Sequence, residues 1–264
     1  MKFDMHCHTK EGSIDAKVDV ESYIHKLIEH GFDGMLITDH NSYKGYQKWK
    51  EISDKLTTSR PFTVLKGIEY DTWDGGHIIA ILPDHVHCKL LELRGMSLLQ
   101  LEKLVHSLGG ILGPAHPYGT GFFALMNNLI AIRNRDIIHN FDFIETFNSC
   151  TIQKCNEMAS RLAKKYEKPA FAGSDAHKLG VVGTAFTTIT DTISTNNDLI
   201  RAVKDRTIIQ VEEDLQQVIL KKSNPLFKQL GIIGYWIYNK LGALFYLPAR
   251  KMIQFIHNNN PNPD

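Results

Sequence analysis

The chain has 264 residues and is 43% hydrophobic, which is enough apolar content to bury a sizeable core and excludes an intrinsically disordered protein. Its formal net charge is +1 with the histidines neutral, so no global electrostatic field favours nucleic acid or an anionic membrane. Four cysteines without a CxxC pair, and an N-terminus without the apolar segment of a secretory signal peptide, indicate a cytoplasmic protein with reduced thiols.

Short apolar runs alternate along the chain with longer segments of helical periodicity. The predicted strands are residues 2–5, 34–38, 63–68, 77–82, 110–114, 143–147, 170–173, 185–190 and 208–211. The predicted helices are residues 20–30, 43–56, 97–108, 153–166 and 197–204. Strands separated by helices of this length indicate parallel strand–helix–strand units, and over this length a closed α/β barrel is favoured over an open sheet.

One connection between these elements is unusually long. Residues 117–140 follow a predicted strand and contain two early glycines and then an apolar, helix-like stretch that ends in Arg133 and Arg135. A long connection inside a compact domain is more often functional than a passive linker. We therefore expect this insertion to form a lid or a pocket wall.

The C-terminal segment is strongly apolar between residues 223 and 257. Its run from 230 to 247 has basic flanks, but Asn239 and Lys240 near its centre argue against a membrane span. We expect a terminal helix, or two short helices broken near Gly242 and Pro248, packed on the barrel or on a second subunit, with binding to a membrane surface as the less favoured alternative. The chain is thus divided into a barrel, residues 1–211, and a C-terminal helical extension, residues 212–264, and its oligomeric state is left open.

Histidines and carboxylates cluster at the ends of the predicted strands, and they account for much of the unusual total of 13 histidines. Because the carboxyl ends of barrel strands converge on one face, side chains far apart in the sequence can meet in one site. The set of candidate metal ligands comprises six histidines and two carboxylates, with Asp15 as a third: His6, His8, His40, Glu69, His77, His116, Asp175 and His177.

The number and type of these ligands predict a multinuclear metal centre. Imidazole and carboxylate together suit Zn, Mn, Fe or Ni, and not Ca or Mg alone. Eight or nine ligands exceed the needs of one tetrahedral ion, so two or three divalent ions are predicted, with a carboxylate bridging a pair. The spacing of His6 and His8 supports this interpretation, because residues i and i+2 of a strand face the same side. Cys7 then faces the other way, as a small buried residue.

Individual members of the set have alternative roles. A lone histidine at a strand end is most often structural, and Glu69 or Asp15 could cap a helix. Asp15 lies shortly before the helix predicted to begin at residue 20, and Glu11 is the alternative ligand if Asp15 is a cap. Asp39 is expected to orient a neighbouring histidine rather than to bind an ion.

Five motifs in this order resemble the PHP superfamily, named for polymerase and histidinol phosphatase, and in particular its stand-alone metal-dependent phosphoesterases. The resemblance covers roughly residues 1–211 and implies a distorted barrel of seven parallel strand–helix units that holds two or three metal ions. The segments ETFN (145–148) and VGT (182–184) are also similar to that branch. The motifs are His6-Cys7-His8-Thr9, Thr38-Asp39-His40, Gly67-Ile68-Glu69, Ala115-His116-Pro117 and Ser174-Asp175-Ala176-His177.

The resemblance also implies how the ligands are divided among the ions. One ion would be held by His6, His8, Glu69 and Asp175, a second by Glu69, His77 and His116, and a third by Asp15, His40 and His177. Many members carry an arginine shortly after the Ala-His-Pro motif, whereas Tyr118 and Gly119 stand there in this chain. We therefore take Arg133, Arg135 and Asn148 as the candidate substrate-binding residues.

The predicted activity is hydrolysis of phosphate esters of small molecules or nucleotides, in which a metal-activated water attacks phosphorus. Glu69, Asp175 and His177 are the predicted catalytic residues, and His177 or a metal-bound water would protonate the leaving alkoxide. One alternative is a 3'-5' exonuclease or another nuclease, which would need a basic groove with aromatic side chains. A second alternative is a non-catalytic scaffold stabilised by metal. Zinc, manganese and iron remain open as the cofactor.

Overall fold

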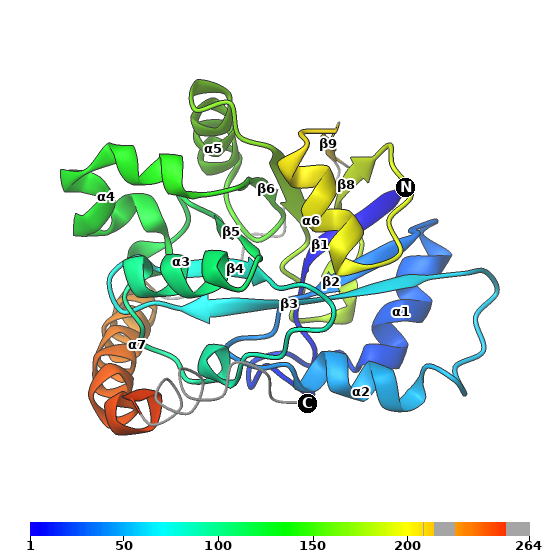
Figure 1. The fold of residues 1–264 in the computed structure, drawn as a ribbon, viewed down its shortest axis with the longest axis horizontal. Helices are drawn as coiled ribbons and strands as arrows, with labels where there is room; N and C mark the ends of the chain where they lie inside the picture. Colours follow the sequence, from blue (N-terminus) through cyan, green and yellow to red (C-terminus); the bar gives the residue numbers. More distant parts are fainter. Residues whose placement is uncertain (208, 214–224, 252–264) are drawn as a thin grey trace.

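The structure is a computed structural model that describes residues 1–207, 209–213 and 225–251. The first residue of the last predicted strand, residue 208, lies outside the described residues, as do residues 214–224 and 252–264 of the predicted extension. Within the described ranges the strands and helices alternate as the sequence predicts (Figure 1).

The described strands form two sheets. A seven-stranded sheet has the order β5-β4-β3-β2-β1-β8-β9, and β6 pairs with β7 in a second sheet. Each of the nine predicted strands has a counterpart, with bounds that differ by a few residues. They are β1 (Lys2–Cys7), β2 (Gly34–Ile37), β3 (Thr63–Asp71), β4 (His77–Ile81), β5 (Ile111–Pro114), β6 (Ile144–Asn148), β7 (Ala170–Gly173), β8 (Ala185–Ile189) and β9 (Ile209–Glu213).

The larger sheet is only partly parallel. The pairs β1–β2 and β2–β3 are parallel, whereas β3–β4, β4–β5, β1–β8 and β8–β9 are antiparallel. The prediction of seven parallel strand–helix units is therefore not confirmed, although the α/β class is. For the β3–β4 pair, the physical reason is the short connection after β3, where Gly76 adopts a φ of +76° and the chain returns directly as β4. A connection without a helix can join only antiparallel neighbours.

The smaller sheet is joined to the larger one on both sides. The Asp142 N–H, just before β6, donates to Leu112 O in β5 at 2.9 Å. The Asp175 N–H, just after β7, donates to His6 O in β1 at 2.9 Å, and Cys7 forms an isolated parallel bridge with Ala176. These contacts make the assembly barrel-like, and they bring the ends of β1 and β7 together.

Helices pack around the sheets (Figure 1). In α1 the buried side chains are Val20, Tyr23, Ile24 and Leu27, which is the spacing of one helix face. The helix begins where Asp19 caps it, by accepting a hydrogen bond from Ser22 N–H at 2.8 Å. The other helices are α2 (Lys44–Ile52), α3 (Leu98–Ser107), α4 (Leu129–Arg133), α5 (Gln153–Lys165), α6 (Asn196–Lys204) and α7 (Pro225–Phe245).

The insertion and its flanking loops contain short 3₁₀ helices around α4. Those in the insertion are η2 (Gly121–Phe123), η3 (Leu125–Asn127) and η4 (Arg135–Asn140), and elsewhere η1 (Lys89–Glu92) follows β4 and η5 (Leu179–Val181) follows β7. Leu125 and Ile138 are fully buried, so the insertion is anchored in the core.

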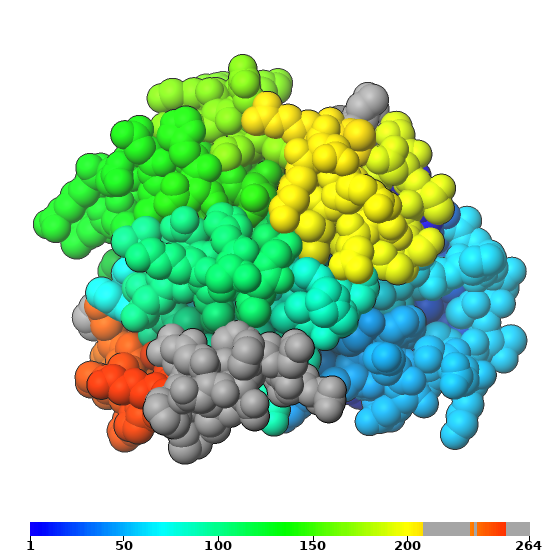
Figure 2. All heavy atoms as spheres, in the orientation of Figure 1, coloured from blue at the N-terminus to red at the C-terminus, as the bar shows by residue number. Residues whose placement is uncertain are grey.

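Helix α7 packs against the connection that follows the β3–β4 hairpin, and Figure 2 shows it at one edge of the molecule. The Lys240 ammonium lies 3.7 Å from the centre of the Trp73 ring, and Asn239 is buried. Gly95, with a φ of +90°, allows close contact because a Cβ there would meet Ala243 N at 2.7 Å. The helix continues through Gly242 and ends at Phe245, and a further helical segment begins at residue 247, so a break lies between the two predicted positions, Gly242 and Pro248.

No helix among the described residues is both long enough and apolar enough to cross a membrane.

Candidate metal centre

The predicted ligands converge on one cluster around Glu69 and Asp175, although they come from six strands and the loops that follow them. His6 lies in β1, Glu69 in β3 and His77 at the start of β4. The remaining members follow a strand directly: His8, His40, His116, Asp175 and His177. When Asp71 is added, the set contains four groups of three ligand atoms. Within each group, the three atoms lie within 4.8 Å of one another.

The antiparallel hairpin explains why His77 reaches the site from the beginning of a strand. In the β3–β4 ladder, Asp71 at the end of β3 pairs with His77 at the start of β4. The next pairing, Ile78 with Pro114, places the end of β5 and therefore His116 at the same edge. Antiparallel pairing thus collects at one edge the residues that a purely parallel barrel would place at opposite ends.

Glu69 occupies the centre of the cluster and is 1% exposed. Its Oε2 lies 3.2 Å from His8 Nε2 and 3.2 Å from His40 Nδ1. Its Oε1 lies 3.0 Å from His77 Nδ1 and 3.1 Å from His116 Nε2. The two oxygens of one carboxylate therefore serve two different sets of histidines, which is the arrangement needed for a carboxylate that bridges two ions.

The HxH motif and Asp175 form one of the ligand groups. His6 Nε2 and His8 Nε2 are 3.1 Å apart, and Asp175 Oδ1 lies 3.2 Å from His8 Nε2 and 3.7 Å from His6 Nε2. All three residues are nearly or fully buried. Several lone-pair donors that point at one another in a buried space fit a bound cation, because without one they would be poorly compensated.

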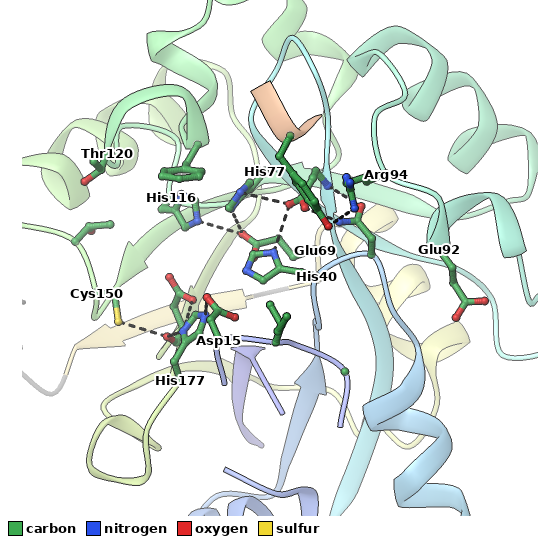
Figure 3. A pocket seen from close by; sticks show the side chains of 18 of the residues that line it. Asp15, His40, Glu69, His77, Glu92, Arg94, His116, Thr120, Cys150 and His177 are labelled. Atoms are coloured by element: carbon green, nitrogen blue, oxygen red, sulfur yellow. Dashed lines mark hydrogen bonds and ion pairs between the residues drawn. The ribbon is translucent and has the colours of Figure 1, made fainter. Parts of the chain in front are cut away.

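The third group differs in composition from the one that the resemblance implies. It contains His8, His40 and His177, whereas Asp15, His40 and His177 were expected. Asp15 is nevertheless present at the site, since its Oδ2 lies 3.0 Å from His177 Nε2 and it lines the cavity (Figure 3). Its alternative role as a helix cap does not apply, because Asp19 caps α1.

Two of the ligands are held by backbone in the left-handed region. His116 has a φ of +29° and Asp175 a φ of +51°. This conformation is costly for residues with a side chain and is found mostly at functional sites. Both residues turn directly out of a strand end into the cavity.

Outer partners orient the ligating rings. Glu145 Oε1 lies 2.9 Å from His6 Nδ1, so the Nε2 of that ring faces the centre. Asp39 Oδ1 accepts a hydrogen bond from Ser13 Oγ at 2.9 Å, and Ser13 Oγ lies 3.0 Å from His8 Nδ1. Asp39 therefore acts through Ser13 on His8, rather than on its neighbour His40. Such partners fix the tautomer and direction of a ligating histidine.

Asp71 was not recognised from the sequence. Its Oδ1 lies 3.4 Å from His40 Nδ1 and 3.4 Å from His77 Nε2, and it groups with these two histidines. The signal that could have revealed it is its position two residues after Glu69, since residues i and i+2 of a strand share a face. The predicted strand ended at residue 68, so this alternation was not followed.

The candidate substrate-binding residues lie elsewhere than expected. Arg133 and Arg135 are exposed and do not line the cavity, and Arg135 instead contacts Met126. The short helices of the insertion direct both arginines away from the site. Asn148 is buried and donates to Asp175 Oδ2 at 3.2 Å, which makes it a partner of a ligand. Arg94, which the sequence analysis did not single out, lines the cavity.

The electrostatics of the cluster favour ionised carboxylates. Burial would raise the pKa of Glu69, but His77, His6 and His40 hold it well below its ordinary value. Burial would likewise lower the pKa of His40, but Glu69 and Asp71 raise it to about 10. A carboxylate kept ionised in a buried site is the form that binds a metal cation. The residues present therefore fit a centre of divalent ions.

The centre opens into a cavity of about 780 Å³ (Figure 3). Besides the ligands, Thr120 and Phe123 of the insertion line it, as expected for a pocket wall. Tyr238 and Tyr246, from the C-terminal segment, line it as well. A cavity of this size suits a ligand of roughly nucleotide dimensions.

Comparisons with known proteins place the fold. Residues 154–208 match a family model described as PHP-associated (PHP_C). No curated protein sequence matches the chain. The solved structure of PsfC from Pseudomonas syringae PB-5123 is 16% identical, with a TM-score of 0.56 over 90% of this chain and 97% of that one.

Two further structures share the fold over most of the chain. A two-domain protein from Bacteroides vulgatus, described as containing a "predicted PHP-like metal-dependent phosphoesterase", is 15% identical, with a TM-score of 0.56 over 81% of this chain and 64% of that one. Endonuclease Q, in complex with a 27-mer duplex substrate with an abasic lesion, is 16% identical, with a TM-score of 0.58 over 80% of this chain and 58% of that one. At these identities the likeness is one of fold.

Proposed function

We propose that this chain, a member of the PHP superfamily, is a metal-dependent hydrolase of phosphate esters on small molecules or nucleotides. The observation that carries the proposal is the position of Glu69, whose Oε1 and Oε2 face separate sets of histidines within 3.0–3.2 Å. Ions held by this carboxylate and the histidines would supply an activated water and neutralise the charge that develops on the phosphoryl oxygens.

The ligand groups support a division among two or three ions. His6, His8 and Asp175 would hold one ion, and His77 and His116 a second, with Glu69 between them. His40 and His177 would hold a third, assisted by Asp15. Zinc, manganese and iron all suit this mixture of imidazole and carboxylate.

The chain's own residues orient the site. Glu145 and the Asp39–Ser13 pair hold the rings of His6 and His8 in place. His177 borders the cavity, and Asp15 lies 3.0 Å from its Nε2. In a centre of two ions, His177 would not be needed as a ligand. His177 and Asp15 are then placed to exchange a proton with the leaving oxygen, because Asp15 stabilises the protonated ring.

The C-terminal segment enters this proposal as part of the substrate pocket. We propose that residues 212–264 form an extension packed on a barrel of residues 1–211, supported by the contacts of α7 with Trp73 and Gly95. The tyrosines that it contributes to the cavity favour a bound small molecule.

A nuclease is the second candidate, and the likeness to Endonuclease Q, whose structure holds a DNA duplex, is the observation that favours it. Against it, the described residues that line the cavity include only one lysine or arginine, Arg94. A site that tracks a nucleic-acid backbone needs several. A non-catalytic scaffold would have no need of an open cavity beside the ligands.

The test combines metal analysis with a substrate panel. The purified protein should contain at least two equivalents of transition metal, and with Mn or Zn it should hydrolyse phenyl phosphate or nucleoside monophosphates. Faster turnover of single-stranded oligonucleotides, with strong dependence on salt, would favour the nuclease. Less than one equivalent of metal after metal-replete expression, together with no turnover of any member of the panel, would refute the proposal.

A further inference from the structure

We propose that Arg94, held in place by α7, binds a second anionic group of the substrate, distinct from the phosphate that is hydrolysed. The substrate class is therefore a small phosphate ester whose leaving alcohol carries a carboxylate or another anion on a planar or apolar body. This inference rests on the proposed function and deepens it.

The charge distribution of the cavity gives the first support. Its described lining contains five carboxylates, those of Asp15, Glu69, Asp71, Glu92 and Asp175, and Arg94 is the single lysine or arginine. Four of the carboxylates belong to the metal centre. The fifth, Glu92, pairs with His87 at 3.5 Å. Arg94 forms no ion pair among the described residues, so its charge is available to a ligand.

The position of Arg94 is prepared by α7. The centre of its guanidinium lies 3.1 Å from the centre of the Tyr238 ring, and Tyr246 lies 5.6 Å away. Gly242 permits this approach, because a Cβ there would lie 2.8 Å from Arg94 Nε. The Arg94 Nη1 donates a hydrogen bond to the Tyr238 hydroxyl, and the Nε is buried beside Gly242. Stacking on an aromatic ring fixes the plane of the guanidinium, and its Nη2 is left for a charge-assisted hydrogen bond to an oxyanion.

The extent of the cavity indicates that Arg94 binds a second group of the substrate rather than the reacting phosphate. Under the proposed function, the phosphate to be cleaved would bind at the ions held beside Glu69, which would supply its counter-charge. The cavity of about 780 Å³ exceeds the space of one phosphate group and continues to Arg94, which lies on the side opposite Thr120 and Cys150 (Figure 3). Phe123, Tyr238 and Tyr246 also line the cavity and offer surfaces for a planar body.

The experiment compares two matched substrates. In 4-carboxyphenyl phosphate the leaving group carries an anion, and in 4-carbamoylphenyl phosphate a neutral amide of the same shape replaces it. We expect the ratio of their kcat/KM values to fall about 10- to 100-fold in Arg94→Gln, mainly through KM for the carboxylate, because one charge-assisted contact is lost. Arg94→Lys should retain part of the preference for 4-carboxyphenyl phosphate over the amide.

A control separates binding from the packing of α7. Lys240 also holds α7, through Trp73, but neither residue lines the cavity. Lys240→Gln should therefore leave the substrate ratio unchanged, even if it lowers the melting temperature. If Arg94→Gln reduces turnover of both substrates equally, or changes neither, the inference is wrong.

A binding measurement distinguishes this failure from a failure of the proposed function. Calorimetry on chelator-treated protein should show tighter binding of 4-carboxyphenyl phosphate than of the amide, and the difference should disappear in Arg94→Gln. A difference in binding without any turnover would preserve the role of Arg94 and count against hydrolysis. Equal binding of both compounds to the wild-type protein would overturn the inference, whatever the activity.

Discussion

Asp71, the last residue of β3, pairs with His77, the first residue of β4, and the two side chains approach to 3.4 Å in the metal centre. A tight antiparallel hairpin thus delivers two ligands that precede and follow the turn. Glu69, two positions earlier on the same strand face, adds a third. One hairpin therefore supplies a large part of the site, and the other strands bring the remaining ligands to its edge.

Glu69→Gln should abolish nearly all activity. The amide retains the volume of the side chain but lacks the charge needed to bridge two ions, so we expect kcat to fall at least about a thousandfold, or about 4 kcal/mol. Steady-state kinetics on phenyl phosphate, with metal content measured in parallel, checks this. The matched control is Glu92→Gln, another carboxylate that lines the cavity but pairs with His87. Wild-type turnover in Glu69→Gln would contradict the mechanism.

Asp71→Asn tests the ligand that the sequence analysis overlooked. Because Asp71 groups with His40 and His77, its loss should weaken one ion and spare the others. We expect about one equivalent less metal after dialysis and a reduced rate that excess metal partly restores. Elemental analysis and metal titration of activity give the answer. If the metal stoichiometry and the catalytic rate of Asp71→Asn are unchanged, Asp71 binds no ion and only positions His40 and His77.

Ser13→Ala should loosen the ring of His8 without removing a ligand. The hydroxyl links Asp39 to His8 Nδ1 and also accepts from His40 N–H at 3.0 Å. Outer partners of this kind are worth about 10- to 100-fold in metal affinity. Competition with a chelator should therefore reveal weaker binding, with little change of kcat at saturating metal. Ser22→Ala, on the exposed side of α1, serves as the control. An identical metal affinity in Ser13→Ala would argue against the relay.

The start of α6 should make stability depend on pH. Desolvation would raise the pKa of Asp198, but hydrogen bonds that its carboxylate accepts from the Thr195 hydroxyl and from the Thr195 and Ser194 N–H groups lower it. Because the folded pKa is below the unfolded value, the stabilisation is present above about pH 4 and is lost as the pH falls through the folded pKa.

Wild type should therefore exceed Asp198→Asn in unfolding free energy at neutral pH, and the difference should close in acid. We expect less than about 1 kcal/mol, since solvent screens this exposed group. Urea denaturation between pH 3 and pH 7, with chelator present throughout, measures it. A difference that grows in acid would have the wrong sign.

The sequence by itself determined the alternation of strands and helices and most of the residues that the structure brings together in the candidate metal centre. Alternation of side chains along a strand made His6 and His8 a pair, and the burial pattern of α1 follows its helical spacing. These are local properties, because they depend on neighbours a few residues apart. The five motifs that resemble the PHP superfamily are local in the same sense.

Only the tertiary structure decided which side chains share the cavity and in which direction the strands run. The antiparallel turn after β3 brought Asp71 to His77, and Tyr238 of α7 and Tyr246 just after it were brought to Arg94 across more than a hundred residues. Arg133 and Arg135 carry the positive charge expected of a phosphate-binding residue, but they are exposed and do not line the cavity. Such placements depend on how distant segments pack together, and packing between distant segments leaves no periodic signal in a single sequence.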